Sequence, residues 1–348
     1  MTRDPTASVV RHSFALRRYE NTLARGVHGL FREAGDRLRD LLTRVDPNEV
    51  SAGWVRVRLA LLDDRAADIL RETYADLARF AGDRLVPLAD LEAEFAARLL
   101  ERTTGSVTIE AGTPRLGVAQ WRSIVSTDPV QGAPLREWWR RQRAEAAFGF
   151  RRQVQLGMTN GETTPEIIRR VRGRFVRPGV YEGGVLQAST RQAETLVRTA
   201  VNQVASRAQL ETYRANADVT TRYVYTATLD DRTSDICRAL DGQEFAYGEG
   251  PVPPQHPNCR SAIRPVVDWK ALGIDPPTPG QRASKDGPVS ARLDYSGWLR
   301  QQSAAEQDEI LGPARGKLFR AGKVTLKDLV RMDGSTLTLD ELREAIAA

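Results

Sequence analysis

The sequence predicts a mainly α-helical protein that carries a small α+β unit in its C-terminal half. Two patterns lead to this fold class. Before residue 215, apolar side chains recur every three or four positions over long stretches, which is the period of an amphipathic helix. Beyond that point, β-branched and aromatic runs alternate with Gly- and Pro-rich turns, as in short strands. Long N-terminal helices, an extended Pro-rich arm and short C-terminal helices complete the expected fold.

The N-terminal elements are predicted to be helices. From 13 to 45 the apolar residues keep the helical period, and Pro47 ends the pattern. A second helix is expected at 66–80. A third is expected at 87–101, because Pro87 suits the first position of a helix.

The middle of the chain continues with helices. An Arg-rich helix is expected at 134–156, followed by a turn and a helix at about 164–174. A loop should then cover 179–184. The next helix is predicted to begin at Ser189, where a capping box with Gln192 precedes a regular apolar stripe that reaches about residue 214.

Strands are predicted after this helix. Residues 220–228 are β-branched and aromatic, and 263–267 form a candidate return strand. Between them, Asp241 and Gly242 suit a hairpin turn. Residues 270–292 are rich in Pro, Gly and polar residues, which indicates a linker or an extended arm. The preceding unit should still fold when this segment and the residues after it are removed.

The chain should therefore divide into four consecutive regions. Short helices are expected near 304–311 and 338–347. The expected regions are an N-terminal helical region at 1–130, a basic helical region at 131–185, a compact α+β domain at 186–268, and an arm with C-terminal helices at 269–348.

Composition narrows the functional classes. The chain has 348 residues, a formal net charge of +6 and two cysteines. No apolar run approaches the ~18–20 residues of a membrane span, and the N-terminus lacks the apolar core of a signal peptide, so we expect a cytosolic protein without a membrane partner. Two cysteines cannot build a disulfide scaffold, and we therefore expect thiols or thiolates.

Arginines are concentrated in one segment. Between 136 and 177 eleven arginines face four glutamates, a net charge of +7. Guanidinium groups can contact phosphates, and Trp138 and Trp139 could stack on bases. The alternative is an ordinary surface helix with solvated arginines. The candidate DNA contacts are Arg136, Arg140, Arg141, Arg143, Arg151, Arg152, Arg169, Arg170, Arg172, Arg174 and Arg177.

Three soft ligands lie in one short stretch. Cys237, His256 and Cys259 suit zinc, and a four-coordinate site would need a further ligand such as Asp231 or Asp235. The alternative is that Cys237 packs as a small hydrophobe while His256 donates a hydrogen bond to a backbone carbonyl.

No catalytic residue is predicted in this stretch. It offers a single histidine, no second base and no Gly-rich phosphate loop. Asp231 and Thr233 precede a short helix and are expected to cap it.

The same stretch carries a family resemblance. The residues that carry it are, in order, Asp231, Thr233, Cys237, Leu240, Gly242, Phe245, His256, Pro257, Cys259 and Arg260. This order resembles the C-terminal signature of the Mu F-type minor head proteins, or head morphogenesis proteins, of tailed phages. Many such proteins have cysteines where Ser234 and Ser261 stand in this chain.

The resemblance implies a non-enzymatic virion component. Such a minor head protein would be present in several copies, inside the capsid or at the portal vertex, and in the host cytoplasm during assembly. Its partners would be the portal protein, other capsid components and DNA, which it would contact nonspecifically during packaging or ejection. Two alternatives stay open: a metal-dependent nuclease or toxin-like enzyme, and a portal-binding adaptor without DNA contact.

Overall fold

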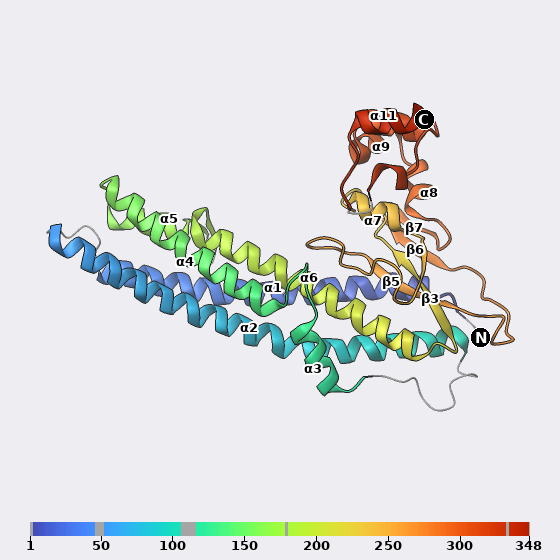
Figure 1. The fold of residues 1–348 in the computed structure, drawn as a ribbon, viewed down its shortest axis with the longest axis horizontal. Coiled ribbons are helices and arrows are strands. Elements are labelled where there is room, and N and C mark those ends of the chain that lie inside the picture. Colours follow the sequence, from blue (N-terminus) through green and yellow to red (C-terminus); the bar gives the residue numbers. More distant parts are fainter. Residues whose placement is uncertain (1–2, 46–51, 106–115, 178–179, 332–333, 348) are drawn as a thin grey trace. The chain divides into compact units, whose positions relative to one another are not determined.

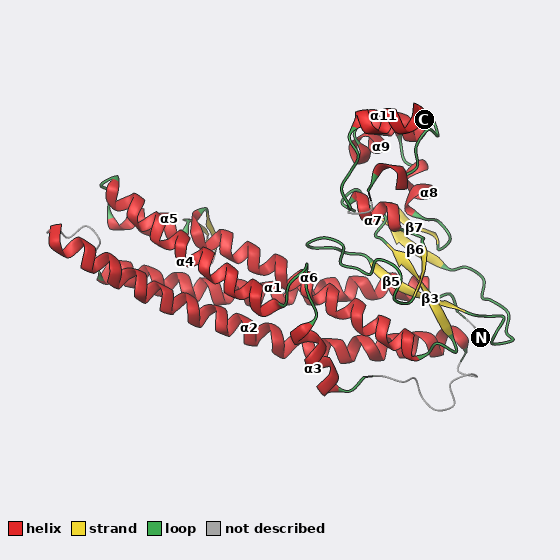
Figure 2. Ribbon diagram, viewed as in Figure 1, coloured by secondary structure: helices red, strands yellow, loops and turns green. Residues whose placement is uncertain are grey.

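The computed structural model describes residues 3–45, 52–105, 116–177, 180–331 and 334–347. Helices account for most of this part of the chain, and the strands form three small antiparallel sheets (Figures 1 and 2). The predicted fold class is thus confirmed. Within the described ranges, no helix combines the length and the apolar character that a membrane span requires.

The elements of the first part are mostly long helices. Their bounds are α1 Thr6–Arg44, α2 Ala52–Thr104, α3 Val118–Thr127, α4 Leu135–Thr159, α5 Thr164–Arg172, β1 Arg174–Arg177, β2 Val180–Glu182 and α6 Gly184–Ala215. The predicted helices at 13–45, 134–156 and 164–174 correspond to α1, α4 and α5. A capping box of Thr163 and Glu166 opens α5, because each side chain satisfies a backbone N–H group of the other.

The two helices predicted at 66–80 and 87–101 are one continuous helix, α2, and Pro87 lies inside it. A proline in a helix interior removes one backbone hydrogen bond, at a cost of about 3 kcal/mol. Here the apolar face continues through the proline, since Leu85, Leu88 and Ala89 are all buried. Packing on both sides of Pro87 therefore offsets the missing hydrogen bond. The periodicity of the sequence alone did not reveal that the helix continues through the proline.

The start of α6 also differs from the prediction. The helix begins at Gly184, and Ser189 is a buried interior residue whose hydroxyl donates to the carbonyl of Val185. The side chain of Gln187 instead accepts a hydrogen bond from the N–H of Gly183, 2.8 Å away. The predicted loop at 179–184 contains β2, which pairs with β1 in a two-stranded hairpin.

The elements of the second part are shorter. Their bounds are β3 Thr220–Thr226, α7 Asp235–Leu240, β4 Glu244–Ala246, β5 Ala262–Val267, β6 Gln281–Ser284, β7 Gly287–Ser290, α8 Tyr295–Arg300, α9 Ala304–Leu311, α10 Pro313–Arg320, the 3-10 helix η1 Lys327–Leu329 and α11 Leu339–Ala347. The predicted strands correspond to β3 and β5. Asp241 and Gly242 connect α7 to β4, so their turn follows a helix and not a strand.

The segment predicted to be an extended arm, 270–292, contains the hairpin of β6 and β7. Arg282 of β6 is 5 % exposed, and its guanidinium group donates to the carboxylate of Asp241. A buried charge can be placed there because it meets an opposite charge. Pro and Gly in this segment thus mark turns around a packed hairpin.

The chain divides into two compact units. Unit 1 comprises Met1–Arg17, Leu88–Trp121 and Asn202–Ala348, and unit 2 comprises Arg18–Pro87 and Arg122–Val201. The helices α1, α2, α3 and α6 contribute residues to both units. This division differs from the four consecutive regions that the sequence suggested, because distant stretches of the chain pack together.

In unit 1 a three-stranded sheet packs against helices. The strand order is β4-β3-β5, and both pairs are antiparallel. Tyr223 and Ile263 of the sheet join one core with Leu100 of α2 and Tyr213 of α6. A second core gathers Leu229 with apolar residues of α8 to α11.

Unit 2 is a helical assembly that also contains the β1–β2 hairpin. A hydrogen bond joins α1 to α6 through His28 and Glu194, and an ion pair joins α4 to α2 through Arg151 and Asp63. Arg172 at the end of α5 pairs with Asp36 of α1. The arginine-rich α4 and α5 therefore belong to this unit.

Candidate metal centre and nucleic-acid interface

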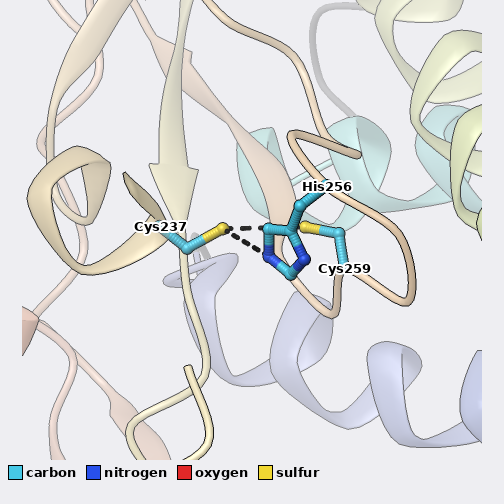
Figure 3. A group of neighbouring side chains, drawn as sticks. All are labelled: Cys237, His256 and Cys259. Carbon is cyan, nitrogen blue, oxygen red and sulfur yellow. Dashed lines mark hydrogen bonds between the residues drawn. The ribbon is translucent and has the colours of Figure 1, made fainter. Parts of the chain in front are cut away.

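The sheet of unit 1 brings the three predicted metal ligands together. Cys237 lies on α7, which follows β3, whereas His256 and Cys259 lie on the loop that precedes β5. Because β3 and β5 are antiparallel, with Thr226 opposite Ala262, the end of one strand adjoins the start of the other. The three side chains consequently converge (Figure 3).

Their ligand atoms are close to one another. Cys237 Sγ lies 3.7 Å from Cys259 Sγ and 3.4 Å from His256 Nε2, and all three atoms lie within 4.8 Å of each other. Both cysteines are 1 % exposed. His256 Nδ1 is 2.9 Å from the carbonyl oxygen of Pro257, so this nitrogen donates, and Nε2 faces the sulfurs.

The two thiols and His256 affect one another's pKa values. The hydrogen bond between the two thiols, with burial, raises the pKa of Cys237 far above its usual value. The same hydrogen bond, together with those from His256 and two backbone N–H groups, lowers the pKa of Cys259. The hydrogen bond to Cys259 raises the pKa of His256, against the effect of burial. A thiolate at Cys259 is thus stabilised within the cluster.

Further polar groups surround the sulfurs. The hydroxyl of Tyr225 lies 3.2 Å from Cys237 Sγ and 3.9 Å from Cys259 Sγ. Ser234 and Ser261 lie beside Cys237, and their side chains partly oppose the rise of its pKa. The sequence did not single out Tyr225, which only the central position of β3 places here.

The expected fourth ligands lie outside this group. Among the described His, Cys, Asp and Glu residues, only Cys237, His256 and Cys259 join this cluster. Asp235 pairs with Arg238 at 2.8 Å, and Asp231 is exposed. The predicted capping roles also differ from the structure, because Ser234 is the N-cap residue of α7.

Thr233 and Arg260 of the signature meet at Asp230. The hydroxyl of Thr233 donates to the carbonyl of Thr228 at 2.6 Å, and it lies 3.0 Å from Asp230 Oδ1. Arg260 forms a two-pronged ion pair with the same carboxylate. Burial opposes ionisation of Asp230, but Arg260 and Thr233 hold its pKa below the usual value. Asp230, which sequence analysis missed, therefore fixes the entry to α7 against the loop before β5.

The remaining signature residues shape the fold around the cluster. Gly242 has a φ of +79°, which favours glycine, and its N–H donates to the carbonyl of Tyr225 at 2.9 Å. Leu240 and Phe245 pack against the buried cluster that contains both cysteines. Pro257 supplies the carbonyl that orients His256. These residues hold the cluster in place but do not themselves offer a metal ligand.

The predicted DNA contacts lie on α4, α5 and β1 of unit 2. Most of the eleven arginines are exposed, and Arg143, Arg170 and Arg172 are partly buried, Arg172 most deeply among the ion-paired ones. Glutamate or aspartate side chains pair with Arg141, Arg151, Arg170, Arg172 and Arg174. Within the described residues, no ion pair is formed by Arg136, Arg140, Arg143, Arg152, Arg169 or Arg177. Six cations of the segment are therefore not neutralised by a direct ion pair.

Comparison with known proteins finds a family match in the middle of the chain. Residues 149–264 match the family described as Phage Mu protein F like protein. This segment runs from α4 to β5 and includes the cluster of Cys237, His256 and Cys259. No curated protein and no solved structure matches the chain significantly. The family match confirms the resemblance carried by the signature residues, and over residues 149–264 the chain is similar to the Mu F-like family.

Proposed function

We propose that the chain is a minor head protein that lies inside the capsid near the portal, assists head assembly and contacts DNA nonspecifically during packaging or ejection. The family match supports the general role, in phage head morphogenesis, with other capsid components as partners and the virion as location. It also favours a structural role over an enzymatic one. The basic surface of unit 2 supports the contact with DNA.

The distribution of ion pairs carries the DNA proposal. Arg136, Arg140 and Arg152 on α4 and Arg169 on α5 are exposed and form no ion pair with another described residue. A phosphate that displaces only water and counterions from such a side chain gains affinity through counterion release. An arginine that is already paired with a glutamate must break that ion pair before it can bind a phosphate. These four arginines are accordingly the principal contacts that we expect.

The test is salt-dependent binding of a mixed-sequence DNA duplex, followed by fluorescence anisotropy. A variant with Arg136, Arg140, Arg152 and Arg169 changed to Gln should bind more weakly. Its slope of log K against log salt should be shallower by about 0.9 per lost contact. The matched control changes Arg11, Arg102, Arg232 and Arg292, four exposed arginines of unit 1, to Gln and should retain the wild-type slope.

Two results would contradict this proposal. One is a wild-type protein that does not bind duplex DNA at low salt, and the other is an equal loss in the control variant. Portal protein that still co-purifies with a chain unable to bind DNA would favour the portal-binding adaptor instead.

We also propose that Cys237, His256 and Cys259 bind zinc as a structural ion. Tetrahedral zinc with bonds of about 2.3 Å to sulfur separates two sulfur ligands by about 3.8 Å, close to the 3.7 Å between these two sulfurs. The hydrogen bond of His256 Nδ1 to a carbonyl is the usual support of a metal-binding imidazole. The hydroxyl of Tyr225 or a solvent molecule would complete the coordination.

Metal analysis of the protein purified without chelator tests this second proposal. Wild-type protein should retain zinc in stoichiometric amount, and chelation should expose the loop 241–259 to protease, because metal binding contributes to folding free energy. A Cys237→Ala/Cys259→Ala variant should bind no zinc and should show the same protease sensitivity without chelator. Wild-type protein that takes up no zinc when zinc is offered would refute the site.

A further inference from the structure

A pocket of about 310 Å³ opens in unit 2, apart from the metal cluster. Its walls come from α1, α6, β2 and the last residue of α5. On α1 the lining positions are spaced as on one helical face, from His28 to Gly35, and on α6 they follow the same spacing from Gln187 to Glu194. Two helix faces and a hairpin therefore enclose one concave site.

Three arginines line this pocket. Arg32 of α1 and Arg191 of α6 are exposed, and neither forms an ion pair with another described residue. Arg172 is only 10 % exposed in its side chain, where Asp36 pairs with it and the ring of Tyr181 lies 4.0 Å from its guanidinium carbon. One guanidinium group is thus held in place, and two are available to a ligand.

The single carboxylate that lines the pocket, that of Glu194, does not neutralise Arg32 and Arg191. Glu194 lies 2.9 Å from His28 Nε2 and accepts from Arg198 Nη2 at 2.8 Å, so its oxygens are already engaged. Burial favours its protonated form, but hydrogen bonds from His28 and Arg198 hold the pKa of Glu194 below the usual value. The pocket consequently keeps a positive potential from Arg32 and Arg191.

The floor of the pocket is apolar and closely packed. Phe31 and Leu186 are 3 % and 5 % exposed. A Cβ atom on Gly35 would lie 3.2 Å from Leu186 Cδ1, so glycine permits α1 and α6 to approach closely here. The volume is near the lower end of small-ligand pockets, about 300 Å³, which suits one anionic group and a small adjoining part.

We propose that this pocket binds the phosphate group of a nucleotide or of a nucleic-acid strand. A phosphate offers several acceptor oxygens, which match guanidinium groups that approach from two helices. A single carboxylate can satisfy only one such bidentate contact. The adjoining sugar would lie against the apolar floor. This site is independent of the arginines on α4 that carry the proposed DNA contact.

Calorimetric titration with three probes tests the proposal: inorganic phosphate, deoxyadenosine monophosphate and a single-stranded DNA 12-mer. Arg32→Gln and Arg191→Gln should each weaken binding by about tenfold or more, because each removes a charge-assisted hydrogen bond. Arg25→Gln, two turns earlier on α1, is the control and should bind as wild type does. Thermal melting should show that all three variants are folded.

Each outcome decides the question. Binding of phosphate or mononucleotide that the pocket variants weaken supports the site and identifies a small phosphorylated ligand. Binding of the 12-mer alone, weakened in the same variants, supports the site and identifies a nucleic-acid strand. Absence of binding to all three probes, or binding that both pocket variants leave unchanged, overturns it. An acidic peptide that displaces the bound probe with higher affinity would reassign the pocket to a protein partner.

Discussion

Asp241 is the residue on which three segments of unit 1 depend. Its buried carboxylate accepts hydrogen bonds from the N–H groups of Ala227 at 2.6 Å and Tyr295 at 2.7 Å, and from Arg282 at 3.0 Å. Burial raises the pKa of Asp241, and Arg282 opposes that effect. The side chain thereby ties the end of β3, the start of α8 and the strand β6 to the turn after α7.

We expect Arg282→Met to destabilise the protein by about 3–5 kcal/mol, because the variant leaves the carboxylate of Asp241 buried without its counter-charge. Arg292→Met removes an exposed arginine from the same segment and should change stability by no more than about 0.5 kcal/mol. Urea denaturation measures both values. The second change Asp241→Asn should recover part of the loss, and equal stability of the two single variants would contradict the role of the ion pair.

At this scale the sequence revealed ligand types but not their surroundings. Cys237, His256 and Cys259 could be grouped because soft ligands are rare in the chain and lie close in sequence. Tyr225 and Asp241 gave no such signal, since a tyrosine in a strand and an Asp-Gly turn are ordinary features. Their roles depend on strand pairing and on Arg282, a residue expected in an extended arm.

The pair of helices α1 and α2 depends on one close approach in unit 2. A Cβ atom on Gly26 of α1 would overlap the ring of Phe80 on α2. Gly26→Ala should therefore cost about 1–3 kcal/mol through overpacking. Gly29→Ala on the same helix has nothing within 4 Å of the added atom and should stabilise by up to about 1 kcal/mol through helix propensity.

Thermal denaturation of both variants checks this expectation. Both variants replace a glycine of α1 with alanine, so helix propensity contributes equally to their stabilities. A difference between their melting temperatures therefore reports the contact with Phe80. Similar melting temperatures for the two variants would show that Phe80 moves aside at little cost.

Elements with a clear period were predictable, and those decided by packing were not. The regular stripes of α1 and α6 and the β-branched run of β3 predicted two helices and a strand with nearly the right C-terminal ends, whereas α1 and α6 begin several residues earlier than predicted. The continuity of α2 through Pro87 depends on burial on both sides of the proline, which local sequence does not record. The hairpin of β1 and β2 is too short for alternation to reveal it.

Over the whole molecule, the residues after 269 belong to the packed structure of unit 1. Tyr295 donates its hydroxyl to the carbonyl of Asp230 at 2.7 Å, and Arg238 of α7 donates to the carbonyl of Ile310 at 2.9 Å. Leu229 is fully buried among residues of α8 to α11. Because of these contacts, we now expect the signature region to depend on the C-terminal segment, whereas the sequence alone led us to expect that it folds without it.

We expect a chain that ends at residue 268 to lose the cooperative unfolding of unit 1, because Leu229 would be exposed and Asp241 left unpaired. Limited proteolysis and circular dichroism measure this loss. A chain that ends at Leu342 loses the exposed residues 343–346 of α11 and the two residues after them, and it should unfold as the full chain does. A stable, protease-resistant fragment 1–268 would restore the linker interpretation.

The distance along the chain between Asp241 and Arg282 also sets an order of events during synthesis. The two partners are 41 residues apart, and a ribosome adds about 5–20 residues per second. The carboxylate of Asp241 is therefore made about 2–8 s before its counter-charge exists. Over that interval the nascent segment has a solvated aspartate where the finished protein has a buried one, and closure of this region must wait until β6 has been translated.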